Sequence, residues 1–231
     1  MGLKKFKTES LDLPNGIDLY QQTYEKDALP DGVLVLKLSV FSDDQGGWFK
    51  EALRVNSERE VISLKEVGVG FNIKQSNESF SKKGVIRGLH FQWNPYMGKL
   101  VRIISGHMVD IVLDIRKGSP TFGKALLYDM PNRHSENWSE WIWVPEGLAH
   151  GNFFLEDSFI EYFCTGEYNS NCEASISPLS ADIDWTMCDK DLKNKLDIIV
   201  NIPLISSKDK NGLTLNQWLR KKNSDKFKYE I

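Results

Sequence analysis

The residues best suited to chemistry cluster in one short stretch of the chain. Positions 84–92 read GVIRGLHFQ, and positions 98–102 read GKLVR. The sixteen residues from Gly84 to Lys99 therefore include two cations, Arg87 and Lys99, and a titratable base, His90. This set suits an anionic substrate that must lose a proton, because histidine exchanges protons near neutral pH.

These residues must be positioned by β-strands, in which residues two apart share a face. Arg87 and His90 are an odd number of residues apart, so they meet in one cavity only if the strand is bulged or bent. Gly88 lies between them and permits such a bulge. Alternatively, Arg87 and Lys99 are solvated strand residues and His90 is a hydrogen-bonded core histidine. Residue types alone slightly favour this plainer interpretation.

Short strands separated by Gly and Pro turns dominate the chain from residue 71 onward, which predicts a β-sandwich or barrel. An earlier β-rich run covers 33–41 and is followed by turn residues at 42–47. The residues at 105–107 predict a hairpin between the strands on either side. Helical patterns are expected at 53–67, 189–196 and 213–222.

Composition excludes several classes of protein. The chain has 231 residues, 41% of them hydrophobic, with a formal net charge of −3. This balance predicts no nucleic-acid partner and no association with a membrane. Cys164, Cys172 and Cys188 form no C-x-x-C pair, so we expect free thiols in a reducing cytoplasm. No leader segment and no membrane span are predicted.

Motifs along the chain resemble the dTDP-4-dehydrorhamnose 3,5-epimerase family. Residues 83–92, KGVIRGLHFQ, resemble the family's KGVLRGLHYQ, and residues 44–51 resemble D-x-R-G-x-F-x-E. Further matches, in the family's order, are residues 75–79, 98–102, 114–123, 143–151, 162–168 and 206–209. Any one motif is weak, but their order makes chance resemblance very unlikely.

The resemblance implies a fold and a reaction. The fold is mainly β, a cupin-like double-stranded β-helix (jelly roll) with a few peripheral helices. Residues 1–28 are an N-terminal extension, 29–218 the epimerase domain and 219–231 a C-terminal tail. The reaction inverts carbon 3, carbon 5 or both of a nucleotide-diphospho-4-keto-6-deoxysugar through an enolate. The resemblance also implies a homodimer, and the strand at 33–41 offers an edge for pairing.

The resemblance also assigns roles to residues. His90 is the base, Asp209 its carboxylate partner, Lys99 the cation beside the carbonyl oxygen, and Tyr162 the proton donor on the opposite face. The substrate-binding residues it implies are Arg87, Gln75 and Asn77 near the diphosphate, Glu51 and Tyr168 at the nucleotide, and His150 beside the sugar. No hydride moves and no G-x-G-x-x-G follows a strand, so no cofactor is expected.

The chain departs from the family pattern at several places. Gly46 stands where the family has an arginine, so one cation for the nucleotide or its phosphates is missing. Residues 176–180 replace a usual stretch, and the segment 186–203 is longer than typical. These departures leave open the identity of the nucleotide and of the sugar.

Other functions remain open at this point. A metal-dependent cupin needs several histidines, but His90 lacks an H-x-H partner, and His107 and His134 are expected in solvated turns. No metal is therefore predicted. A non-catalytic sugar-nucleotide binding module on the same fold is a second alternative. A third is a related epimerase that acts only at carbon 3 or carbon 5, or on a GDP-linked heptose.

Overall fold

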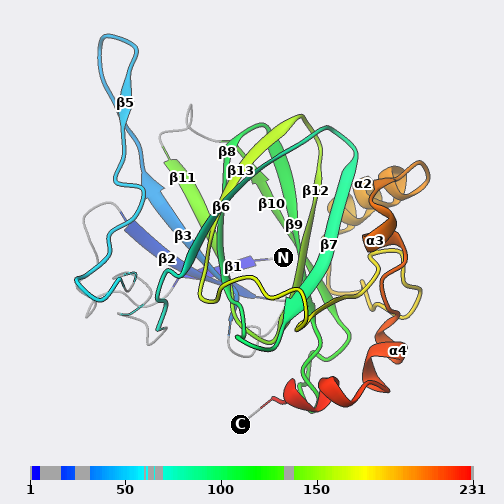
Figure 1. Cartoon of the computed structure of the whole chain (residues 1–231). Coiled ribbons are helices and arrows are strands. Elements are labelled where there is room, and N and C mark those ends of the chain that lie inside the picture. The colour runs from blue at the N-terminus through cyan, green and yellow to red at the C-terminus, as the bar shows by residue number, and fades with distance from the viewer. Residues whose placement is uncertain are drawn as a thin grey trace.

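The computed structural model describes residues 2–5 and 17–23 as backbone, and residues 32–59, 61, 65, 70–132 and 138–229 in full. Two mostly antiparallel sheets face each other, and helices cover the outer face of one of them (Figure 1). This arrangement confirms the expected jelly roll with peripheral helices. The division of the chain at 28 and 218 stays a prediction.

The larger sheet has seven strands. In spatial order they are β1 (Gly2–Lys5), β2 (Ile17–Thr23), β3 (Leu34–Ser39), β11 (Trp138–Val144), β8 (Lys99–Ser105), β13 (Ser158–Cys164) and β6 (Gln75–Ser81). The predicted strand at 33–41 is thus β3. β11 pairs with one side of β3 and β2 with the other, so the strand lacks the free edge that was expected for dimer pairing. Part of the N-terminal extension therefore continues this sheet.

The smaller sheet has six strands. In spatial order they are β10 (Ala125–Pro131), β9 (His107–Asp114), β12 (Leu148–Phe154), β7 (Val85–Gln92) and β14 (Glu173–Ser175), while β15 (Leu204–Ile205) pairs in parallel with β7. Residues alternate between the two faces of each strand. On β12, Leu148 and Phe154 pack between the sheets, whereas Ala149 and Phe153 pack under the helices.

Helices follow the strands and cover the smaller sheet. They are α2 (Lys190–Val200), α3 (Ser207–Lys210), α4 (Leu215–Leu219) and a 3₁₀ helix, η2 (Lys222–Lys226). Asp189 caps α2 and Thr214 caps α4, which confirms helices near the two predicted positions in this part of the chain. Leu196, Trp218 and Phe227 are buried against the sheet, so the helices belong to the core.

One expectation about local structure is wrong, and another holds only in part. Residues 105–107 do not close a hairpin, because β8 belongs to the larger sheet and β9 to the smaller one. The tight turn at Gly106 carries the chain between sheets, and a turn signal cannot distinguish the two cases. The helix expected over 53–67 is absent from residues 53–59, which are irregular and pack Leu53 against the larger sheet. Further along that range, Lys65 is helical and its N–H donates to the carbonyl of Val61 at 3.0 Å.

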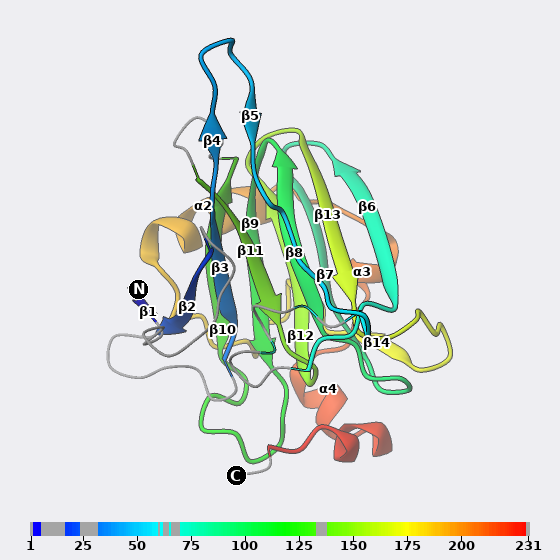
Figure 2. The same ribbon diagram turned by 90° about the vertical axis from the view of Figure 1, so that its left-hand side faces the viewer.

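A short hairpin extends away from the body of the molecule. It consists of β4 (Phe41–Ser42) and β5 (Trp48–Phe49), and Figure 2 shows it projecting beyond the ends of the sheets. Gly46 takes the positive φ that its turn requires. The hairpin exposes three aromatic side chains: Phe41 by 56%, Trp48 by 49% and Phe49 by 69%.

The bulge expected near Gly88 is present. His90 pairs with His150 of β12 and Arg87 pairs with Asn152, so a step of three residues on β7 opposes a step of two on β12. Gly88 has φ of +109°, and a Cβ at this position would lie 2.6 Å from the Cα of Gly151. The bulge therefore requires glycine, and it brings Arg87 and His90 to one cavity.

Replacing Gly88 by alanine is expected to destabilise the protein more than the same change at Gly118. Both glycines have positive φ, which costs roughly 1–3 kcal/mol for other residues. A Cβ at Gly118 meets nothing within 4 Å, whereas one at Gly88 overlaps β12. Urea unfolding of both variants measures the difference. Equal losses of stability would contradict the requirement for a close approach of β7 and β12.

Candidate active site

Most of the predicted residues surround two adjoining cavities between the sheets. The outer cavity, about 350 Å³, is lined by Gln75, Asn77, His90, Phe91, Gln92, Met97, Lys99, Tyr162, Cys164, Tyr168, Glu173 and Lys208. The inner cavity, about 150 Å³, is lined by Ser79, Arg87, His90, Lys99, Val101, His150, Gly151, Asn152, Ile160 and Tyr162. His90, Lys99 and Tyr162 line both cavities, so they lie where the two join.

His90 is held by Asp209, a residue 119 positions away in the chain. His90 Nε2 lies 2.7 Å from Asp209 Oδ1, and the backbone N–H of Gly88 donates to Asp209 Oδ2 at 3.3 Å. Burial acts to raise the pKa of Asp209, but these hydrogen bonds and one from Ser206 outweigh it and lower the pKa. An ionised Asp209 accepts a hydrogen bond from Nε2–H, which leaves Nδ1 of a neutral imidazole as the basic nitrogen.

Lys99 begins β8 and directs its side chain into the cavities. Among the residues described, its ammonium makes no hydrogen bond with the protein. Burial lowers the pKa of Lys99, although the nearby Cys164, Asp110 and Glu173 act in the opposite direction. A negative charge that entered the cavity would restore this pKa and bind the ammonium strongly, because the site is shielded from water.

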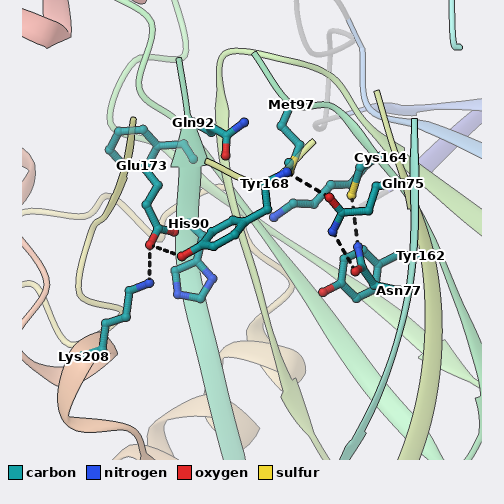
Figure 3. Close-up of a pocket in the computed structure, with 12 residues that line it drawn as sticks. Gln75, Asn77, His90, Gln92, Met97, Tyr162, Cys164, Tyr168, Glu173 and Lys208 are labelled. Atoms are coloured by element: carbon teal, nitrogen blue, oxygen red, sulfur yellow. Dashed lines mark hydrogen bonds and ion pairs between the residues drawn. The ribbon is translucent and has the colours of Figure 1, made fainter. Parts of the chain in front are cut away.

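Tyr162 faces His90 from the other sheet. Tyr162 is on β13 of the larger sheet and His90 on β7 of the smaller one, and Figure 3 shows them on different sides of the pocket. Burial raises the pKa of the Tyr162 phenol, and this effect exceeds the opposing influence of Arg87. The phenol is therefore protonated at neutral pH and able to donate a proton.

His150 forms a second histidine–carboxylate pair. Its Nε2 lies 2.9 Å from Asp110, and both side chains are buried. Burial lowers the pKa of His150 more than Asp110 raises it, and the nearby Lys99 and His90 lower it further. His150 is thus neutral near pH 7 and acts in the inner cavity as a hydrogen-bonding group.

Arg87 and Gln75 lie in different cavities. Arg87 lines the inner cavity, where its Nε donates to Ser81 Oγ at 2.8 Å. Gln75 lines the outer cavity and donates to Asn77 Oδ1 at 2.8 Å, while its Oε1 accepts from the backbone N–H of Tyr168. Arg87 and Gln75, both predicted to bind the diphosphate, therefore lie on either side of the junction between the cavities and not in the same cavity.

Several residues of the outer cavity were not predicted. Tyr168 Oη and Lys208 Nζ both donate to Glu173, at 2.7 Å and 2.6 Å, and these bonds hold the Tyr168 ring across the pocket (Figure 3). Lys208 is next to Asp209 in a recognised motif, so the sequence could have indicated that it lies near the site. Glu173 had no such signal, because its place beside β7 depends on the pairing of β14.

Gln92 joins the two loops that form the mouth of the outer cavity. Its Nε2 donates to the carbonyls of Pro95 and Glu167, and its Oε1 accepts from the N–H of Asn169. Gly166 packs so closely on the first loop that a Cβ there would lie 2.5 Å from the carbonyl oxygen of Tyr96. The loops that carry Met97 and Tyr168 are thus fixed relative to His90, two residues before Gln92.

Two predictions differ from the structure at this stage. Glu51 reaches neither cavity and is bound by the guanidinium of Arg54, at 2.6 Å. His107 is not in a solvated turn, since it begins β9 and its Nε2 lies 2.6 Å from Asp129. His134 lies outside the described residues. Within the described part of the chain, no group of three or more His, Cys, Asp or Glu side chains is arranged to hold a metal ion.

Comparison with known proteins identifies the family of the chain. The profile of the family described as dTDP-4-dehydrorhamnose 3,5-epimerase matches residues 28–217. The chain belongs to this family. It is therefore an epimerase with the cupin-like fold of that family.

Individual relatives show how far the similarity extends. The epimerase is 38% identical to the dTDP-4-dehydrorhamnose 3,5-epimerase of Shigella flexneri, over 81% of this chain and 92% of the relative. It is 36% identical to the enzyme of the same name from Neisseria gonorrhoeae, over 82% of this chain but only 52% of that longer relative. The solved RmlC epimerase of Legionella pneumophila, in complex with dTDP-4-keto-L-rhamnose, superimposes with a TM-score of 0.67 at 29% identity, covering 86% and 94% of the two chains.

The helices described in the structure are too short or too polar to cross a membrane.

Replacing Asp209 by asparagine is expected to flatten the acid side of the stability profile. Because the folded-state pKa of Asp209 is lowered, its ionisation stabilises the native state above the unfolded pKa, about 3.9. This contribution disappears as pH falls through the folded pKa. Urea unfolding between pH 5 and pH 3 should therefore show a smaller drop in stability for Asp209→Asn than for wild type. Asp191→Asn, at an exposed carboxylate, is the control and should lose as much stability as wild type. A drop in stability for Asp209→Asn equal to that of wild type would contradict the ionised, hydrogen-bonded state assigned to Asp209.

Proposed function

We propose that this epimerase inverts carbon 3, carbon 5 or both of dTDP-4-keto-6-deoxyglucose, as a dTDP-4-dehydrorhamnose 3,5-epimerase does. One observation carries the proposal: a histidine–carboxylate pair and a tyrosine come from opposite sheets, and a half-buried lysine lines the same two cavities. Inversion of a carbon needs a proton acceptor on one face and a proton donor on the other. A binding module needs neither.

The reaction begins with removal of a proton beside the ketone. His90 Nδ1 accepts the proton from the carbon, and the electrons of the C–H bond pass into an enolate. Asp209 stabilises the imidazolium that forms, because its carboxylate accepts the Nε2–H bond. General-base catalysis of this kind typically contributes 10²–10⁴-fold in rate.

Lys99 stabilises the charge that develops on the ketone oxygen. Its ammonium makes no hydrogen bond to the described protein residues, so it is available for the oxygen without first breaking a contact. The enolate is more negative than the ketone, so the attraction is stronger in the intermediate than in the ground state. His150, neutral beside Asp110, adds a hydrogen bond in the inner cavity.

Tyr162 completes the inversion from the opposite face. Its phenol donates a proton to the enolate carbon, a new C–H bond forms, and the ketone is restored. His90 keeps the proton that it removed and exchanges it with solvent, as Tyr162 regains one. Each turnover therefore carries a solvent proton into the sugar, and no redox cofactor takes part.

The outer cavity suits the nucleotide end of the substrate. Tyr168 offers an aromatic face for a base, and Gln75 and Asn77 offer amide groups. Lys208 supplies a cation in the outer cavity and Arg87 one in the adjoining inner cavity, and a diphosphate at the junction would suit both. These contacts partly replace the cation that Gly46 does not provide. We also place the protein in the cytoplasm, since its three cysteines are free thiols.

Two copies of the chain are proposed to form a homodimer that completes the site. The projecting hairpin exposes Trp48 and Phe49, and Glu51 follows it without reaching either cavity of its own chain. Exposed aromatic side chains on a projecting element favour burial in an interface. In this arrangement Glu51 reaches the nucleotide in the partner's outer cavity.

Proton NMR in deuterated water tests the chemistry. With dTDP-4-keto-6-deoxyglucose, wild type is expected to introduce deuterium at the carbons that it inverts. His90→Ala should reduce exchange by about 10²–10⁴-fold and retain dTDP binding. Tyr162→Phe should still allow proton removal but yield little inverted product. Binding without any exchange by wild type would favour a binding module, and exchange only with a GDP-linked sugar would overturn the nucleotide assignment.

Mixing two inactive variants tests the shared site. Glu51→Gln and His90→Ala are each expected to have low activity alone. If Glu51 acts in the partner's site, re-equilibrated mixed dimers contain some intact sites, and a 1:1 mixture recovers about a quarter of wild-type activity by statistics. Sedimentation confirms that both variants are dimers. No recovery from mixed dimers, or a monomer in sedimentation, would contradict the proposal.

A further inference from the structure

Asn152 stands out among the residues that line the inner cavity. It is 5% exposed, and its Oδ1 is buried without a hydrogen-bond partner within the described structure. Buried polar groups are nearly always paired, because an unpaired one loses its bonds with water without compensation. The arrangement therefore indicates a polar group that is supplied from outside the chain.

The place of Asn152 in the fold explains why its amide faces the cavity. On β12, residues two apart share a face, and Asn152 lies between His150 and Phe154 on the interior face. It pairs with Arg87 on one side and Asp110 on the other. Its neighbours do not satisfy it. Arg87 donates to Ser81 and Phe80, and Asp110, bound by His150 through Oδ2 and unpartnered at Oδ1, can only accept.

We propose that Asn152 is a specificity-determining residue that binds a hydroxyl group of the sugar in the inner cavity. This inference rests on the proposed function. A ring whose reacting carbon lies between His90 and Tyr162 extends one edge into this cavity, since both residues line it. An amide both donates and accepts, as does a hydroxyl, whereas a phosphate only accepts and would leave Oδ1 unpaired.

Stability and activity should change in opposite directions when Asn152 is replaced by leucine, a side chain of similar size. Removing an unpaired buried oxygen is expected to stabilise the free protein, raising Tm by about 2–4 °C. With dTDP-4-keto-6-deoxyglucose, kcat/KM should fall about 10–100-fold because the hydroxyl loses its partner. The Kd for dTDP alone should stay within about 2-fold of wild type.

Asn132→Leu is the matched control. Asn132 uses the same amide group to donate to the carbonyl of Ile104, at 2.9 Å, at the far end of β8 from Lys99. Losing this bond should lower Tm and leave kcat/KM unchanged. The opposite signs at the two asparagines distinguish a group reserved for a ligand from one that supports the fold.

Three outcomes would overturn the inference. A lower Tm for Asn152→Leu would mean that the amide has a structural partner. A higher Tm with unchanged kcat/KM would mean that its partner is only a water molecule. If the replacement weakened the binding of dTDP as much as it lowered kcat/KM for the sugar substrate, the nucleotide and not the sugar would lie at Asn152. Failure of the proposed function is separate: wild type itself would then show no exchange with the dTDP-linked sugar, whether or not it binds dTDP, and the sugar assignment would fall with it.

Discussion

The hydrogen bond between His90 and Asp209 depends on more of the structure than any other contact in the site. His90 belongs to the barrel, whereas Asp209 lies on a helix of only four residues at the far end of the sequence. That short helix is held by the Ser206 cap, by β15 beside β7, and by helices that bury Leu196 and Trp218 on the smaller sheet. The helical layer therefore serves to bring one carboxylate behind one imidazole.

The same carboxylate also connects the base to the backbone that positions it. Asp209 accepts the N–H of Gly88, the residue at which β7 bulges. Without the bulge, the alternation of the strand would send Arg87 and His90 to opposite faces. Because the jelly roll has two facing sheets, the opposite wall of the cavity supplies Tyr162 without any further special geometry. One irregular glycine and one buried carboxylate thus give a regular fold a base and an acid on opposite sides of a substrate.

The sequence predicted the parts of this arrangement that depend on local spacing or on a recognised motif. The odd separation of Arg87 and His90 required a bulge, and Asp209 was identified by its motif although nothing local indicated its partner. Side-chain networks between distant segments could not be predicted from the sequence, because Gln92 and Glu173 acquire their roles only when the loops and β14 pack beside β7. The turn at Gly106 shows the same limit, since a glycine turn allows a hairpin or a passage between sheets, and only the global topology decides.

Polar groups in this protein are satisfied to different degrees according to what they do. Asp114 has no part in the cavities, and its two carboxylate oxygens accept bonds from Arg116, Ser119 and Thr121 in a buried network. These bonds outweigh burial and lower its pKa, as expected of a group that supports the fold. Asn152 is also buried, yet its Oδ1 lacks such partners, and Lys99 is half-buried with no hydrogen bond to the described residues. Leaving them unpaired makes the free protein less stable than it would otherwise be, and natural proteins accept this kind of cost mainly at functional sites. The unpaired groups face the cavity where an enolate and a sugar hydroxyl would supply what the protein does not, so substrate binding and catalysis draw on interactions that folding left unused.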